Sequence, residues 1–214
     1  MAKARDTKTK TRIQREKTEE ILAAALDIFS SAGFRGASIN EISKRAGMST
    51  PSLLYYFQSK EHIHRELLSR TLLVWLGPLN LMKDSDDPVE EICTYVRRKL
   101  EISEQFPRES RLFANEILMG IPRAEQSQFD PLRSIFDAKI ALIESWVRDG
   151  RIAPVDPHHL MYSIWATTQH YADFESQIKE LSPEKMGTLF RDAETHLVAM
   201  YRTMLVPNGP EASE

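Results

Sequence analysis

Residues 38–60, which read SINEISKRAGMSTPSLLYYFQSK, constrain the fold of this chain more than any other stretch. Ser38 followed three residues later by Glu41 predicts a capping box, and apolar residues at helical spacing predict a short helix that Gly47 ends. Ser49 predicts the start of a second short helix. Two short helices joined by a tight turn that contains glycine form a helix-turn-helix.

The second of these helices carries small polar and hydroxylated side chains at its start. Such a helix can enter the major groove of DNA with its first turn at the base edges. We therefore expect phosphate contacts from Tyr56 and Lys60 and contacts near the bases from Thr50, Ser52 and Tyr55. The full set of candidate DNA-binding residues is Ser38, Ser49, Thr50, Ser52, Tyr55, Tyr56 and Lys60. The alternative is an ordinary pair of short helices in an all-helical protein.

The charge of the chain is unevenly distributed along its length. Residues 1–60 carry 11 Lys and Arg against 6 Asp and Glu, a net charge of +5, whereas residues 61–214 carry a net charge of -8. Seven of the basic residues lie in residues 1–17. The basic end is thus the end with the helix-turn-helix, and a solvated basic arm there is compatible with phosphate binding.

Apolar residues recur at helical spacing throughout the rest of the chain, and no alternating pattern is long enough to predict a strand. We predict an all-α protein. The expected helices cover residues 18–32, 60–76, 88–106, 108–119, 131–149, 157–174 and 182–205, with Gly77 and Pro78 bending or breaking the second of them. The expected organisation is a basic disordered arm (1–17), a helix-turn-helix domain (18–60), a ligand-binding and dimerisation domain (61–206) and a disordered tail (207–214).

The helix expected at 157–174 is apolar nearly all round, which predicts burial on several sides. Trp165 and Gln169 are four residues apart and share a helix face, so an aromatic wall and an amide point into one space. We select Trp75, Trp165, Gln169 and Tyr171 as candidate ligand-binding residues. The alternative is that Gln169 is satisfied by its own chain or by a second subunit.

Residues 21–60 resemble the N-terminal domain of TetR-family repressors in the patterns ALxxFxxxGF, EIxxxAGMS and LLYYFxSKE. The segments WLGPL (75–79), RLFANEILMG (111–120) and APVDPHHLMYSIWATTQHYADF (153–174) resemble the pyrimidine-utilisation (Rut-type) regulators of that family. The resemblance implies a sensor of a pyrimidine base. Uracil suits the candidate residues, because one Gln amide can meet its adjacent N–H and C=O groups and a Trp can stack on its ring. The second short helix begins with STPS where the closest relatives are expected to carry a Lys and an Asn, so we expect a different operator.

Other classes of function find little support in the sequence. Neither a GxSxG elbow nor a phosphate-binding loop of the Walker type is present. The pairs His62 with His64 and His158 with His159 do not share a helix face, so we expect no metal site, and we expect no cofactor. Cys93 is the only cysteine, which excludes an intrachain disulfide. No apolar run approaches the length of a membrane span, and we expect a soluble, cytoplasmic protein.

Together these observations predict a homodimeric transcriptional regulator, a repressor that releases operator DNA when it binds a small flat heterocycle such as uracil. The expected dimer is a four-helix bundle of the helices at 157–175 and 183–205 with their symmetry mates, because their apolar faces are broad. Two alternatives stay open: a DNA-binding protein without a small ligand, and a small-molecule enzyme on a helical scaffold.

Overall fold

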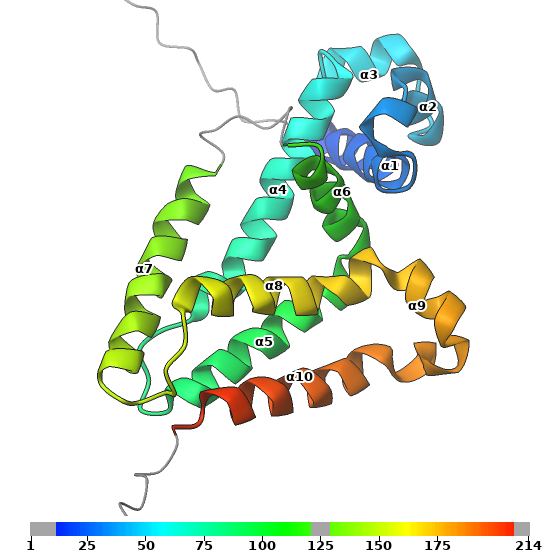
Figure 1. Cartoon of the computed structure of the whole chain (residues 1–214). Coiled ribbons are helices and arrows are strands. Elements are labelled where there is room, and N and C mark those ends of the chain that lie inside the picture. The colour runs from blue at the N-terminus through cyan, green and yellow to red at the C-terminus, as the bar shows by residue number, and fades with distance from the viewer. Residues whose placement is uncertain (1–11, 121–128, 208–214) are drawn as a thin grey trace, which may run out of the picture. The chain divides into compact units, whose positions relative to one another are not determined.

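The computed structural model of the chain describes residues 12–120 and 129–207 (Figure 1). Within these residues the regular structure is helical and contains no strand, which confirms the predicted all-α fold. The helices are α1 (Arg12–Gly36), α2 (Ile39–Arg45), α3 (Thr50–Tyr56), α4 (Lys60–Leu81), α5 (Pro88–Gln105), α6 (Pro107–Leu118), α7 (Asp130–Arg148), α8 (Pro157–Asp173), α9 (Glu175–Leu181), the 3-10 helix η2 (Pro183–Thr188) and α10 (Leu189–Leu205).

The chain forms two compact units, residues 1–67 and 68–214. The first unit holds α1, α2, α3 and the start of α4, and its core is formed by apolar side chains of these helices. The most deeply buried of them are Ile21, Ala25, Phe29, Ile42, Leu53 and Ile63. Helix α4 begins in the first unit and ends in the second.

The helix-turn-helix forms through the predicted local signals. The Ser38 hydroxyl accepts a hydrogen bond from the Glu41 backbone N–H at 3.2 Å, and the Glu41 carboxylate accepts one from the Ser38 N–H at 3.0 Å, which confirms the capping box. Gly47 then turns the chain at φ 66°, a conformation that favours glycine. Ser49 caps α3 by accepting from the Ser52 N–H.

In the second unit α5 packs against both α8 and α10, and these three helices form its centre (Figure 1). Tyr95 of α5, Trp146 of α7 and Tyr201 of α10 are almost completely buried there. Trp146 Nε1 donates a hydrogen bond of 2.8 Å to the Asp84 carboxylate, so the indole N–H is satisfied inside the core.

Helix α1 starts earlier than the sequence indicates. It begins at Arg12, so residues 12–17 are helical although we expected them in the disordered arm; residues 1–11 of that arm lie outside the described residues. Arg12 pairs with Glu16 and Lys17 pairs with Glu20, and pairs at this spacing support a helix that has no apolar stripe of its own. Gly33 has non-helical angles (φ 69°, ψ 175°), so it interrupts the helix near the predicted end.

Two further expectations about helix boundaries are wrong. Helix α4 is not broken at Gly77 and Pro78 but runs to Leu81, since a proline removes one backbone hydrogen bond and need not end a helix; a bend there stays a prediction. The last α-helix does not begin at Ser182: Pro183 opens the 3-10 turn η2, α10 begins at Leu189, and the unpredicted helix α9 precedes both. The predicted tail from residue 208 onward lies outside the described residues.

Helix α8 is not buried on every side within one chain. Tyr162 and Phe174 are about half exposed, and Ala166 and His170 are exposed between them. The exposed residues follow at intervals of four and therefore form one stripe along the helix. In the part of the chain that the structure describes, no helix has the length and apolar character that crossing a membrane requires.

Candidate functional site

The candidate DNA-binding residues of α3 differ in how far their side chains are exposed to solvent. Tyr55 is 75% exposed, Ser52 is exposed and Tyr56 is half-buried with its ring edge-on to that of Tyr55. Leu53 is fully buried and fixes the opposite face of the helix in the core. Ser52 and Tyr55 are thus the candidate residues best placed to reach a base edge.

Three of the candidate hydroxyls make hydrogen bonds within the helix-turn-helix itself. Ser38 is the capping residue of α2, and the Ser49 hydroxyl lies 2.8 Å from that of Ser52 while it caps α3. The Thr50 hydroxyl donates to the Asn40 side chain at 3.0 Å and lies 2.9 Å from the Ser43 hydroxyl. These bonds hold α2 and α3 at a fixed angle, so Thr50 links the two helices of the motif.

Lys60 has a different environment from the one expected for a phosphate contact. Its ammonium donates hydrogen bonds to the backbone carbonyls of Phe34 at 2.9 Å and of Ala37 at 2.7 Å. It also lies 4.3 Å from the centre of the Phe34 ring. Lys60 therefore ties the start of α4 to the segment after Gly33, and a phosphate would have to compete with these carbonyls.

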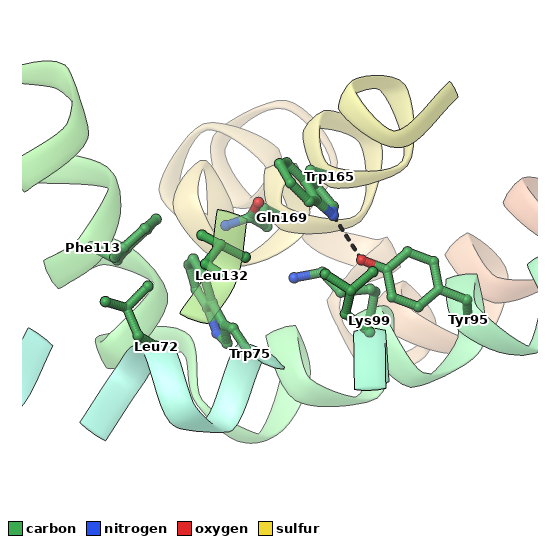
Figure 2. Close-up of a pocket in the computed structure, with 9 residues that line it drawn as sticks. Leu72, Trp75, Tyr95, Lys99, Phe113, Leu132, Trp165 and Gln169 are labelled. Atoms are coloured by element: carbon green, nitrogen blue, oxygen red, sulfur yellow. Dashed lines mark hydrogen bonds between the residues drawn. The ribbon is translucent and has the colours of Figure 1, made fainter. Parts of the chain in front are cut away.

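The second unit contains a cavity, partly open to solvent, between α4, α5, α6, α7 and α8 (Figure 2). The structure brings Trp75, Trp165 and Gln169 together in its wall. The described residues that line it are Leu72, Trp75, Leu79, Tyr95, Lys99, Phe113, Leu132, Trp165 and Gln169.

Aromatic side chains give this pocket its shape. The Trp75 ring meets Phe113 edge-on with 4.6 Å between ring centres. Trp165 Nε1 donates a 2.7 Å hydrogen bond to the Tyr95 hydroxyl, which fixes both rings (Figure 2). Burial raises the pKa of Tyr95, so its hydroxyl remains protonated at neutral pH. Such rigid aromatic walls suit a flat ligand.

Two polar side chains enter the otherwise apolar pocket from different helices. Gln169 of α8 presents an amide that can both donate and accept. Lys99 of α5 is only 3% exposed, and its Nζ lies 4.7 Å from the centre of the Trp75 ring. Figure 2 shows the Lys99 ammonium pointing into the space bounded by Trp75, Trp165 and Gln169.

Burial lowers the pKa of Lys99 from 10.5 to about 8, although the charge of Asp173 acts in the opposite direction. Asp173 itself accepts a 2.6 Å hydrogen bond from Ser110, and burial raises the pKa of its carboxyl. Among the described residues no carboxylate lies within ion-pair distance of Lys99, and no side chain or carbonyl accepts a hydrogen bond from its ammonium. Within the described part of the chain this cation thus has neither a hydrogen-bond acceptor nor an ion-pair partner.

The fourth candidate ligand residue, Tyr171, does not line the pocket. It follows Gln169 by two positions, which places it on nearly the opposite side of α8, and its ring lies 6.2 Å from that of Phe190 in α10. Sequence reasoning missed Tyr95 and Lys99. The signal was present, because both occupy the buried stripe of α5 and a lysine in such a stripe needs an explanation.

Comparison with known proteins assigns both units. Residues 21–67 match the family described as "Bacterial regulatory proteins, tetR family", and residues 68–208 match "YcdC-like protein, C-terminal region". The chain is 42% identical over 186 residues to the HTH-type transcriptional regulator RutR of Escherichia coli strain K12, which covers 87% of this chain and 86% of that protein. It is 46% identical over 54 residues to the regulator YdgC of Bacillus subtilis, 25% of this chain and 28% of that one.

Solved structures support the same fold. SCO4942 from Streptomyces coelicolor, described as a transcriptional regulator, superimposes with a TM-score of 0.71 at 21% identity over 90% of this chain and 99% of that chain. A transcriptional regulator from Rhodococcus sp. Rha1 does so with a TM-score of 0.60 at 18% identity over 90% and 99% of the two chains.

Proposed function

The chain belongs to the TetR family of bacterial transcriptional regulators, which bind operator DNA and act as dimers, and from this premise we propose that it is a repressor released from its operator by a flat heterocycle, uracil or a close relative. The family assignment makes it a regulator and not an enzyme. The rest of the proposal concerns the ligand, the direction of regulation and the residues involved.

One observation carries the proposal: Trp75 of α4 lines the same cavity as Trp165 and Gln169 of α8, some ninety residues later in the sequence. An amide that faces a flat ring can donate to a carbonyl and accept from the neighbouring N–H, which is the pattern of a pyrimidine dione. The aromatic walls supply stacking surfaces. The resemblance to the pyrimidine-utilisation regulators supports the same class of ligand.

Helix α4 supports the link from ligand to DNA. It carries Trp75 in the pocket and, at its other end, Lys60 in the unit that holds the helix-turn-helix. A ligand that favours one position of Trp75 therefore acts on a helix that both units share. Its effect on operator binding is limited to its differential affinity for the two states, typically about 1 to 3 kcal/mol.

For the homodimer we propose an interface of α8 and α10 with their symmetry mates. Tyr162 of α8 and Met200 and Met204 of α10 are 49%, 39% and 44% exposed in the single chain. Large apolar side chains that gather on neighbouring helices indicate a protein interface. A two-fold arrangement would present two α3 helices to successive major grooves about 34 to 36 Å apart.

The test of this function is Gln169→Leu, which removes both hydrogen-bonding directions at nearly constant volume. We expect the variant to fold and to bind operator DNA, but uracil should no longer release it. Gln177→Leu, on the exposed surface of α9, is the matched control and should respond like wild type. Equal calorimetric affinity of wild type and Gln169→Leu for uracil, or a wild-type protein that no pyrimidine releases, would refute the proposal.

A further inference from the structure

The pocket contains a feature that stacking and the Gln169 amide do not use, the buried ammonium of Lys99. Its position is set by α5: Tyr95 lies one turn before it, and the Tyr95 hydroxyl is fixed by Trp165 Nε1. Lys99 lies in the buried stripe of the helix, and its ammonium points into the cavity (Figure 2).

A buried cation is costly unless a partner compensates it. The described residues compensate Lys99 only in part, through the face of Trp75 at 4.7 Å and the more distant charge of Asp173. Asp173, the carboxylate that acts on Lys99 electrostatically, is bound to Ser110 and lies beyond ion-pair distance. An ammonium has three donors and no acceptor, so a ligand group that pairs with it must be an acceptor.

Resting on the proposed function, we propose that Lys99 determines the specificity of the pocket by donating a hydrogen bond to a carbonyl oxygen of the bound base. The base lies with one carbonyl-bearing edge at Lys99 and another edge at Gln169. The ligand class is thereby narrowed to cyclic imides and diones, such as uracil. A base that presents an exocyclic amine to Lys99, as cytosine can, places a donor against a donor and is rejected.

The test is a cycle that pairs changes in the protein with changes in the ligand. Uracil, 2-thiouracil and 4-thiouracil are titrated by calorimetry into wild type and into Lys99→Met, which keeps the length of the side chain and removes the charge. Sulfur is a weak acceptor, so each thio-analogue weakens one carbonyl contact. Lys139→Met, a variant in α7 outside the pocket lining, is the control for removal of a partly buried lysine.

We expect uracil affinity to fall about ten- to hundred-fold in Lys99→Met and to be unchanged in Lys139→Met. One of the two thio-analogues should bind much more weakly than uracil to wild type but nearly as well as uracil to Lys99→Met. That analogue identifies the carbonyl that faces Lys99. Cytosine should bind wild type at least ten-fold more weakly than uracil.

If uracil binds but both thio-analogues lose the same factor in wild type and in Lys99→Met, Lys99 makes no carbonyl contact and the inference is overturned while the proposed function stands. If no pyrimidine binds wild type, the proposed function and the inference about Lys99 are both refuted. A circular dichroism melt of each variant shows whether a loss of affinity comes from unfolding.

Discussion

Replacing Lys99, which lines the pocket, with methionine should make the protein more stable. Burial lowers the pKa of Lys99 from 10.5 to about 8. At 1.36 kcal/mol for each pH unit, this difference means that the charged form costs the folded state about 3 kcal/mol at neutral pH. A methionine fills similar space without that cost.

The difference in stability between Lys99→Met and wild type should depend on pH in a characteristic way. Below about pH 8 the lysine is protonated in both states and the full cost is present. Between about pH 8 and 10.5 the folded state has lost the proton while the unfolded chain keeps it, so the stability of wild type rises relative to the variant. Above pH 10.5 the lysine is neutral in both states, so the folded state no longer carries the cost of a buried charge.

Urea unfolding of wild type, Lys99→Met and Lys139→Met at equal protein concentration and at pH 7, 9 and 10.5 measures this effect. We expect the free energy of unfolding of Lys99→Met to exceed that of wild type by up to about 3 kcal/mol at pH 7 and the gap to close by pH 10.5. Lys139→Met should show no such gap, because Lys139 merely donates to the Met82 carbonyl at the surface of the core. A Lys99→Met protein less stable than wild type at pH 7, or a gap independent of pH, would refute the reasoning.

Three further outcomes follow from the same structure. The affinity for uracil should decline above about pH 8 in wild type but not in Lys99→Met, since burial lowers the pKa of Lys99 and the ammonium is the donor; calorimetry across pH 6 to 9 measures it. Lys60→Ala should lower the stability of the first unit by about 1 to 3 kcal/mol in denaturant, because two backbone carbonyls lose their donor, whereas Ser52→Ala should leave stability unchanged and alter the base preference in binding to variant operators. Tyr162→Asp should shift the sedimentation of the protein from dimer to monomer, and a dimer that persists at low micromolar concentration would contradict the proposed interface.

The parts of the fold that could be predicted from sequence are those that local chemistry determines. The capping box of Ser38 and Glu41 and the turn at Gly47 depend on residues only a few positions apart, so reading them requires no tertiary information. Helix α9 could not be predicted, because ESQIKEL has no apolar stripe and none of its side chains is buried. The start of α10 was missed for a related reason: Pro183 is equally suited to begin a 3-10 turn.

The pocket was only partly predictable, because it is assembled from residues that different helices bring together. Trp165 and Gln169 share a face of one helix and could be paired from their spacing. Lys99 could be assigned to the buried stripe of α5, but nothing local determines that this stripe packs on α8 beside Trp165 and Gln169. The surroundings of Lys60 could not be predicted either, because its ammonium is bound to carbonyls from residues more than twenty positions earlier; its phosphate contact stays a prediction.

The pocket places its two polar groups on the two helices that pack together at the centre of the second unit, Lys99 on α5 and Gln169 on α8. A ligand with a carbonyl at each edge can bridge them, and it then supplies the partner that the buried ammonium lacks. A carbonyl that accepts from Lys99 offsets part of the cost of burying the ammonium, which adds to the affinity for an acceptor ligand without any new apolar contact. Trp75 of α4 lies against the same ammonium. A ligand that pairs with Lys99 therefore also contacts the helix that both units share. A ligand that stacks but offers no acceptor would fill the pocket and leave that charge as it was, so it should bind without releasing the operator.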